Sequence, residues 1–352
     1  MIRTSPRMST VLLTGGSGFF GGVLKNRLLA NGLSCVNVDL QRDDVVHDRL
    51  VSVQADICDR VAMAPLFARY RFDCVFHCAA ILAHDVKDRG VLWASNVVGT
   101  EVIADLCDEH GVGKVVFTSS NCLWAEPFNR PVTEDDEPRP REVYGESKWA
   151  AEQVLLKPGR RFHAVIIRTP TIVDAGRLGL LAILFEFIDE GRRVWVVGGG
   201  KNRYQFIYAE DLADACIKAM SYPGRGIFNI GSDEVAPLRE VYQRVIDRAG
   251  TGARIASLPR LPTLAAMRLA HALGVSPLGP YQYRMIAEDF VFDTTKIKRE
   301  LSWTPTLTNG EMLSRAFEYY RANRGEIHNR TDASAHRRPA RMGVIRLLKW
   351  VS

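Results

Sequence analysis

The stretch Val11–Gly21, which reads VLLTGGSGFFG, decides the fold of this 352-residue chain. Its first four residues form a short apolar run that predicts a buried strand, and the glycine turn Gly15-x-x-Gly18-x-x-Gly21 follows directly. Glycines let the backbone turn tightly and approach a pyrophosphate, while the N-terminus of a following helix supplies backbone N–H groups and a positive dipole. The stretch therefore predicts a dinucleotide-binding turn between a strand and a helix.

Strand-like and helix-like segments alternate after this turn. The expected strands are Val11–Thr14, Ser34–Leu40, Leu50–Ala55, Cys74–Ala79, Lys114–Ser119 and Ala164–Arg168. The expected helices are Phe20–Asn31, Arg60–Tyr70, Asn96–His110 and Tyr144–Leu156. Several of the strands are apolar on both faces, as strands covered by helices on both sides must be. This pattern predicts an α/β fold of the Rossmann type, with right-handed βαβ units and a doubly wound parallel sheet.

The second half of the chain is less regular and predicts a smaller substrate-binding lobe. Its expected elements are a helix at Leu178–Glu190, a strand at Arg193–Val197, a helix at Asp211–Met220 and a strand at Ile227–Ile230. We expect an NAD-binding Rossmann domain over residues 9–172 and a lobe over 173–322 that is interleaved with late Rossmann elements. Residues 323–352 are expected to form a basic linker and an amphipathic C-terminal tail.

The composition narrows the class of protein. Apolar residues make up 47% of the chain and charged residues 24%, which is typical of a folded globular protein and not of a disordered or membrane-spanning one. The seven cysteines are an odd number without a Cys-x-x-Cys pair, which favours a reduced cytoplasmic enzyme over a disulfide framework or a zinc site. No signal peptide is predicted, because the first apolar stretch is too short.

The net charge of +6 is concentrated near the C-terminus. Residues 326–352 contain six Lys or Arg and two acids, a charge of +4, so that about +2 remains for the rest of the chain. We therefore expect no nucleic-acid partner. Residues 343–351 are apolar with interspersed basic residues and are too short to span a bilayer. They are expected either to lie on the inner membrane surface or to dock on the body or a partner subunit.

Asp39 ends the second expected strand, 18 residues after Gly21. A carboxylate at this place accepts hydrogen bonds from the ribose hydroxyls and repels a 2′-phosphate, which favours NAD over NADP. Arg42 lies close enough in sequence to weaken that preference, and the alternative interpretation of Asp39 is an ordinary turn residue.

The ends of the third and fourth strands also face the expected cofactor. Asp56 and Ile57 follow the third strand, where an acid can meet the adenine amino group. Ala79 and Ala80 follow the fourth strand and are small enough to let a dinucleotide pass. His77 is interpreted as a packed strand-end residue, and no metal site is predicted.

Tyr144 and Lys148 form a Tyr-x-x-x-Lys pair that lies on one face of a helix. The phenol of a tyrosine in water has a pKa of about 10. A neighbouring ammonium stabilises the phenolate and so lowers that pKa. Ser120 ends the preceding strand, 24 residues before Tyr144, and its hydroxyl can bind the substrate oxygen. These three residues predict oxidation or reduction at a secondary alcohol.

With these motifs the chain resembles the extended short-chain dehydrogenase/reductase family, the NAD-dependent epimerase/dehydratase group, from about Val11 to Tyr320. The resemblance rests on the glycine turn, Asp39, Asp56-Ile57, Ala79-Ala80, Asn96-Val97-Val98-Gly99-Thr100, Ser119-Ser120, Tyr144-x-x-x-Lys148 and Arg168-Thr169-Pro170. It implies a homodimer that pairs through the helices at 96–110 and 144–156.

The resemblance also assigns roles to individual residues. It implies that Ser120, Tyr144 and Lys148 are the catalytic triad and that Asn96 supports the active-site helix. It implies contacts with NAD from Gly15, Gly18, Phe19, Phe20, Gly21, Asp39, Asp56, Ile57, Ala79, Ala80, Tyr144, Lys148 and Pro170.

The family's shared step is hydride transfer from a carbinol carbon to the nicotinamide while Tyr144 takes the hydroxyl proton. The family's 4,6-dehydratases have an Asp-Glu pair where this chain has Asn121-Cys122, which disfavours dehydration. The first prediction is a nucleotide-sugar epimerase, with Thr171 and Arg203 as substrate contacts.

The alternative is an NAD-dependent dehydrogenase that resembles the 3β-hydroxysteroid dehydrogenase branch and acts on a hydrophobic or lipid-linked alcohol. Residues 200–206 and 273–281 resemble that branch more closely than they resemble the epimerases. In addition, Arg168 is followed by Thr169-Pro170-Thr171, where epimerases usually have an asparagine that contacts the diphosphate.

Overall fold

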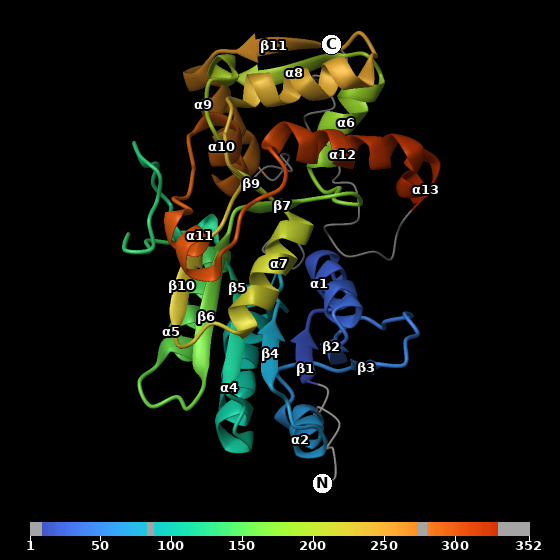
Figure 1. Cartoon of the computed structure of the whole chain (residues 1–352). Coiled ribbons are helices and arrows are strands. Elements are labelled where there is room, and N and C mark those ends of the chain that lie inside the picture. The colour runs from blue at the N-terminus through green and yellow to red at the C-terminus, as the bar shows by residue number, and fades with distance from the viewer. Residues whose placement is uncertain (1–8, 83–87, 274–279, 330–352) are drawn as a thin grey trace.

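The structure is a computed structural model that describes residues 9–82, 88–273 and 280–329. Its centre is a seven-stranded sheet with the order β10-β6-β5-β4-β1-β2-β3, in which neighbouring strands are parallel (Figure 1). The strands of this sheet are β1 (Thr10–Thr14), β2 (Ser34–Asp39), β3 (Leu50–Gln54), β4 (Cys74–His77), β5 (Lys114–Ser120), β6 (His163–Thr169) and β10 (Gly226–Asn229). The expected doubly wound α/β fold is confirmed.

Helices cover both faces of the sheet and form most of the second lobe. They are α1 (Phe19–Ala30), α2 (Arg60–Arg69), α3 (Arg89–Trp93), α4 (Gly99–His110), α5 (Val143–Leu156), α6 (Leu181–Asp189), α7 (Ala209–Met220), α8 (Leu238–Ala249), α9 (Arg260–Ala272), α10 (Pro280–Ala287), α11 (Thr295–Leu301), α12 (Asn309–Ala322) and α13 (Arg324–Asn329). Shorter helical turns are the π-helical η1 (Ala94–Val98) and the 3-10 turns η2 (Asn121–Leu123) and η3 (Gly198–Gly200). No helix within these described ranges is long and apolar enough to cross a bilayer.

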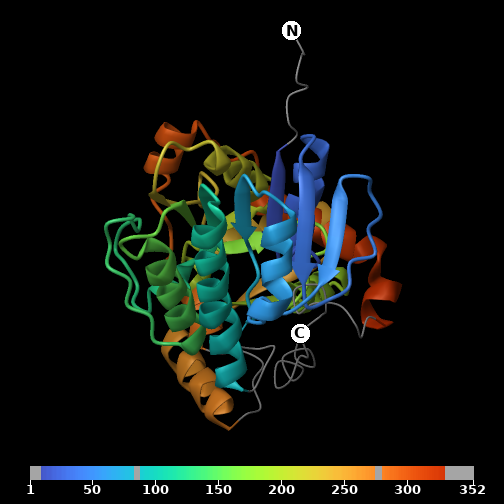
Figure 2. The same cartoon turned by 90° about the horizontal axis from the view of Figure 1, so that it is seen from below.

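Alternate residues of each strand enter two different cores, which explains why the strands are apolar on both faces. Leu12 and Val75 pack with residues of α2, α4 and α5 on one face. Leu13 and Phe76 pack with residues of α1 and α7 on the other face. Figure 2 shows the sheet from below, between these helix layers. Each of the six strands expected in the first half of the chain is present, with ends within one or two residues.

A third core belongs to the lobe that gathers at one end of the sheet, at the top of Figure 1. It contains two short parallel pairs, β7 (Thr171–Val173) with β9 (Phe206–Tyr208) and β8 (Arg193–Val197) with β11 (Arg254–Leu258). The lobe is interleaved with the sheet, because β10 pairs with β6 and α7 packs on α1. The first part of the expected linker is instead the helix α13 (Arg324–Asn329), and its Ile327 is buried in the lobe core. The amphipathic tail predicted at 343–351 lies outside the described residues.

Candidate active site

The backbone around the glycine turn packs too closely to leave room for a Cβ at Gly15 or at Gly21. Gly15 has a φ of +80°, and a Cβ there would lie 2.8 Å from the Cα of Ala79. A Cβ on Gly21 would collide with the carbonyl oxygen of Gly15, where the first turn of α1 approaches the loop. Gly18 is the N-cap of α1 and has no side chain that could cap the helix. The turn therefore brings bare backbone to a helix N-terminus, which is an arrangement that accepts a pyrophosphate.

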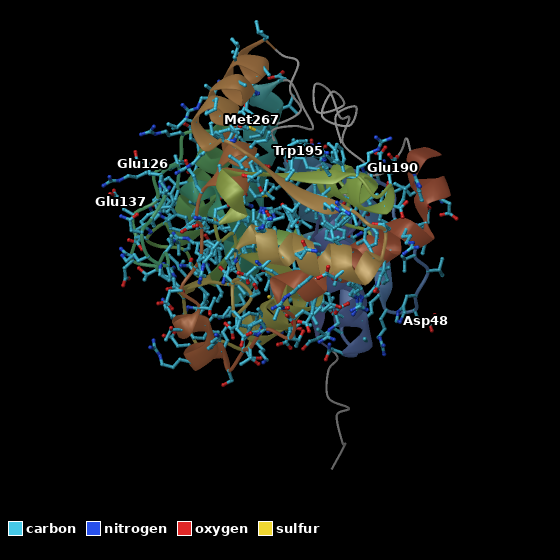
Figure 3. The ribbon with its side chains drawn as sticks, turned by 90° about the horizontal axis from the view of Figure 1, so that it is seen from above. Asp48, Glu126, Glu137, Glu190, Trp195 and Met267 are labelled. Atoms are coloured by element: carbon cyan, nitrogen blue, oxygen red, sulfur yellow. The ribbon has the colours of Figure 1, made fainter. Side chains whose placement is uncertain are left out.

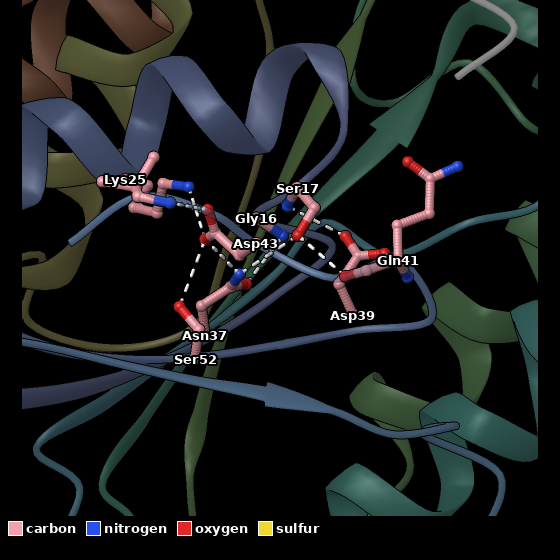
Figure 4. Close-up of polar contacts among 9 residues, drawn as sticks. Gly16, Ser17, Lys25, Asn37, Asp39, Gln41, Asp43 and Ser52 are labelled. Atoms are coloured by element: carbon pink, nitrogen blue, oxygen red, sulfur yellow. Dashed lines mark hydrogen bonds and ion pairs between the residues drawn. The ribbon is translucent and has the colours of Figure 1, made fainter. Parts of the chain in front are cut away.

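Two polar side chains of β2 fix this turn (Figure 4). Asn37 Oδ1 accepts a hydrogen bond from the Gly16 N–H at 2.9 Å. Asp39 Oδ2 accepts one from the Ser17 N–H, also at 2.9 Å. The carboxylate of Asp39 thus lies beside the turn, which is the position from which it can reach a ribose, while Arg42 pairs with Asp44 at 3.3 Å.

A buried ion pair supports Asn37 from the other side and was not predicted from the sequence. Lys25 of α1 donates to Asp43 at 2.5 Å, and Asn37 Nδ2 donates to the same carboxylate at 2.8 Å (Figure 4). Burial alone would raise the pKa of Asp43, but the hydrogen bond and the charge of Lys25 lower it below its ordinary value. The loop after β2 is therefore tied to both α1 and the glycine turn.

The other predicted cofactor residues lie at the same edge of the sheet. Asp56 accepts a hydrogen bond from the Cys58 N–H at 2.9 Å. Ile57 is buried against Gly99, where a Cβ would lie 2.7 Å from its side chain. Phe19 and Phe20 are buried in the core beneath α1, so their backbones and not their rings are available to a ligand. This edge includes the place where the strand order reverses, between β1 and β4, which is where open α/β sheets bind dinucleotides.

His77 links the glycine turn to the helix that carries Asn96. The Ala79 N–H donates to Thr14 Oγ1 at 3.2 Å, and Thr14 Oγ1 lies 2.7 Å from His77 Nδ1. His77 Nε2 lies 2.9 Å from Thr100 Oγ1, which donates to the carbonyl oxygen of Asn96 at 2.7 Å. These partners assign the proton to Nε2. Burial lowers the pKa of His77 to about 3, so the ring is a neutral, packed link, and its interpretation as a packed residue is confirmed.

Asn96 lies in the π-helical turn η1 and contacts α5. Its Nδ2 donates to Ser147 Oγ and to the Ile81 carbonyl, both at 3.0 Å, and its Oδ1 accepts from the Ile81 N–H at 2.8 Å. Ser147 Oγ in turn donates to the carbonyl oxygen of Tyr144 at 2.8 Å. Asn96 is therefore placed to hold the first turn of α5, where Tyr144 begins the Tyr-x-x-x-Lys motif.

Lys148 lies one turn further along α5 and is buried. Its ammonium is 3.9 Å from the centre of the Phe117 ring on β5. Burial lowers the pKa of Lys148 to about 8, against smaller raising effects from Cys78 and Glu152. The ammonium is therefore the main form at neutral pH and is lost as the pH rises through about 8.

The backbone packs the Ser120 segment directly onto α5. Ser120 ends β5 and caps η2, because its Oγ accepts from the Cys122 N–H at 3.2 Å. A Cβ on Gly145 would collide with the carbonyl oxygen of Cys122. Glycine beside Tyr144 therefore lets the segment that follows Ser120 lie against the first turn of α5, so that the end of β5 lies close to the helix that carries Tyr144 and Lys148.

Tyr204 joins this site from the lobe and was missed in the sequence analysis. Asn121 Nδ2 donates to the Tyr204 hydroxyl at 2.8 Å, and Thr171 Oγ1 lies 3.5 Å from the same hydroxyl. Thr171 also donates to the sulfur of Met285 in α10 at 3.9 Å. Pro170 is buried between β6 and β7, directly before Thr171. The predicted substrate contact Thr171 therefore lies beside the residue that follows Ser120.

Arg203, the other predicted substrate contact, has an exposed side chain, while its neighbour Tyr204 is buried. Its backbone N–H donates to Asp289 at 2.7 Å. The alternation of exposed and buried residues along this short extended segment could have identified Tyr204, but the run is too short to show its period in the sequence.

Arg168 has a structural partner. Its guanidinium donates to Glu152 of α5 at 2.8 Å, and both side chains are buried. It also stacks near Trp124, 5.1 Å from the ring centre. The pair fastens α5 to β6 one turn after Lys148.

The fold and these contacts define a short-chain dehydrogenase/reductase with a dinucleotide site at the end of its sheet. Residues 11–231 match the NAD dependent epimerase/dehydratase family. Uncharacterized protein y4nG of Sinorhizobium fredii is 37% identical over 345 residues, which cover 97% of this chain and 86% of that protein. The chain belongs to the NAD-dependent epimerase/dehydratase family, and the expected cofactor, NAD, and the expected class of enzyme agree with this membership.

Relatives with two kinds of activity are similar to the chain. UDP-glucose 4-epimerase of Mycolicibacterium smegmatis is 28% identical, covering 88% of this chain and 98% of that protein. Sterol-4-alpha-carboxylate 3-dehydrogenase, decarboxylating, of Bos taurus is 27% identical, covering 68% and 70%. Among solved structures, the UDP-glucose 4-epimerase of Thermotoga maritima has a TM-score of 0.74 at 23% identity, covering 89% of this chain and 99% of that one. This last likeness concerns the fold.

Proposed function

We propose that the protein oxidises a secondary alcohol through Ser120, Tyr144 and Lys148, and that its substrate is a nucleotide sugar that it epimerises. The observation that carries the catalytic part is the packing of Gly145 on the Cys122 carbonyl, which brings the Ser120 segment and the Tyr-x-x-x-Lys helix together. The nucleotide-sugar part is supported by the match to UDP-glucose 4-epimerase along nearly all of that relative's length.

The residues present fit NAD. The tight glycine turn can form because Gly15 and Gly21 lack a Cβ, and it leaves backbone N–H groups at the start of α1 for a pyrophosphate, with Asp39 beside it for the ribose hydroxyls. NAD, when bound, supplies the acceptor for a hydride from the carbinol carbon.

The chain's own residues handle the oxygen and the proton. Tyr144, as the phenolate, takes the hydroxyl proton, and the ammonium of Lys148 one turn away favours that phenolate. Ser120 donates its hydroxyl to the substrate oxygen as it becomes a carbonyl. Epimerisation then requires reduction of the same carbon on its opposite face, with Tyr144 returning the proton. Asn121-Cys122 supplies no acid for elimination of water, so dehydration stays disfavoured.

The test is incubation of the purified protein with UDP-sugars, without added NAD, followed by chromatographic separation of the 4-epimers. Interconversion of one epimeric pair would support the proposal, and Thr171→Val should then raise KM if Thr171 contacts the sugar. Absence of interconversion for every pair, from protein that contains NAD, would contradict it.

The second candidate is oxidation of a hydrophobic or lipid-linked alcohol. The similarity to sterol-4-alpha-carboxylate 3-dehydrogenase, which covers 68% of this chain, favours it. Steady formation of NADH with apolar secondary alcohols would favour this candidate, because an epimerase releases no net NADH.

We also propose a homodimer in the cytoplasm that pairs through α4 and α5. Exposed Trp93 and Val98 lie on η1 and its flank, next to these helices, and would be covered in such a pair. Light scattering after gel filtration should give the mass of two chains, and Val98→Glu should lower it to that of one.

A further inference from the structure

Helix α9 turns an apolar face outward. Within the described structure none of its side chains is buried, although it packs on α10. Leu261 is 81% exposed, Leu269 is 62% exposed, and Leu273 at the C-cap is 67% exposed. Ala265 and Ala272 are also exposed and share this side of the helix at helical spacing. Single exposed leucines are common on protein surfaces, but several that line one face of a helix mark an interaction site.

The opposite face of α9 already has a partner. Thr263, Leu264, Met267 and Ala270 are half-buried on that side. The Tyr283 hydroxyl of α10 donates to the Met267 carbonyl at 2.9 Å, and the Tyr283 ring packs edge-on against His271. Figure 3 labels Met267 on α9, and Figure 2 shows the helix standing at the margin of the molecule. The leucine face, formed by Leu261, Leu269 and Leu273, is therefore exposed and does not form the packing interface with the lobe.

The charges beside this face identify what would cover it. The α9 sequence contains Arg260, Arg268 and His271 and no acidic residue. Arg260 lies 3.9 Å from Glu288, whereas Arg268 is exposed at the border of the leucine face. The chain's own apolar tail carries Arg346 and Lys349, so like charges disfavour it as the cover, and a second copy of α9 is disfavoured for the same reason. An anionic lipid bilayer complements this face, because its acyl chains can take up the leucines and its negative headgroups can pair with the arginine.

We propose that the outward face of α9 docks on an anionic membrane surface, with Leu261, Leu269 and Leu273 inserted among the acyl chains and Arg268 at the headgroups. The helix lies in the plane of the bilayer and does not cross it. Its inner neighbour α10 carries Met285, the contact of Thr171, so the docked face lies one helix away from the proposed substrate site. Docking is independent of the reaction catalysed.

The test is flotation of the full chain with phosphatidylcholine vesicles that contain phosphatidylglycerol, compared with vesicles of phosphatidylcholine alone. We expect binding to the anionic vesicles, weakened by salt. Leu261→Ser with Leu269→Ser should lower the partition coefficient at least about tenfold, since each leucine loses its apolar burial. Arg268→Glu should lower it by about tenfold or more through the reversed charge.

Matched controls separate this face from other causes. Val61→Ser changes a valine of α2 that is 83% exposed, far from α9 in Figure 1, and should leave flotation unchanged. Arg346→Glu with Lys349→Glu tests the tail, and the α9 variants should still weaken binding in that background. Circular dichroism and NAD binding confirm that each variant is folded.

Three results would overturn the proposal. The wild-type chain fails to float with anionic vesicles, the α9 leucine variant floats as well as the wild type, or that variant changes the oligomeric mass, which would make the face a contact between protein chains.

Discussion

Tyr144 is the residue on which the proposed chemistry depends most directly. Tyr144→Phe removes the hydroxyl that exchanges the proton and leaves the ring and the helix in place. We expect turnover of an identified substrate to fall roughly 10²–10⁴-fold, the usual contribution of a general acid or base. NAD affinity, measured by calorimetry, should change far less than turnover, because the other expected NAD contacts remain. A variant that retained most of its activity would assign the proton transfer to another group.

Lys148 gives the site an expected pH dependence. Because burial lowers its pKa to about 8, the ammonium is present below that pH and is lost as the pH rises through it. The value of kcat/KM should therefore fall on the alkaline side near pH 8. Lys148→Arg keeps a cation throughout this range, so whatever activity remains should lose that alkaline fall.

The pH profile of Lys148→Arg is the informative comparison, because a purely structural role for Lys148 would lower the rate without moving the profile. An identical alkaline limb in the two proteins would show that another group titrates there.

At the scale of elements, the junction of β5 and α5 should be intolerant of a single methyl group. Gly145→Ala places a Cβ against the Cys122 carbonyl and must move either η2 or the first turn of α5. We expect kcat to fall by about 10²-fold, since displacement of about 1 Å has such an effect on reacting groups. Gly113→Ala is the control, because a Cβ there meets no atom within 4 Å. Equal kinetics for the two variants would contradict the proposed junction.

The buried ion pair between Arg168 of β6 and Glu152 of α5 should contribute to the free energy of unfolding. Glu152→Gln leaves the buried guanidinium of Arg168 without its counter-charge, and loss of one partner of a buried pair costs roughly 3–5 kcal/mol. Urea denaturation should show that decrease. Arg168→Met combined with Glu152→Leu should recover most of it, because the charge is then removed together with its partner. A decrease below about 1 kcal/mol for the single variant would mean that water reaches the pair.

The elements themselves were predictable where their pattern is long. β5 was predictable because the apolar, β-prone run Val115–Phe117 is followed directly by the hydroxyl residues Thr118, Ser119 and Ser120. The three-residue strands β7 and β9 were not, since three residues show no period. α13 was interpreted as linker because its composition is polar, and only the burial of Ile327 in the folded lobe reveals the helix.

Over the whole molecule, the parts of the candidate site that lie at strand ends and helix starts were predictable from the sequence. The glycine turn, Asp39 and the Tyr-x-x-x-Lys pair have fixed positions relative to strand and helix ends, so their meeting at one edge of the sheet follows from the topology. Tyr204 and the Lys25–Asp43 pair were not foreseen, because their partners are distant in sequence and only tertiary packing brings them together. The substrate depends on such contacts between lobe and sheet, which is why sequence alone left two candidates.

The central claim is that this fold holds NAD and uses it in a closed cycle of oxidation and reduction. The most direct measurement is to denature the purified protein and identify the released nucleotide by mass spectrometry. We predict NAD or NADH in nearly stoichiometric amount. Protein that is empty but binds added NAD reversibly would favour the dehydrogenase candidate over the epimerase. Release of NADP would contradict the account, because Asp39 beside the glycine turn should repel its 2′-phosphate.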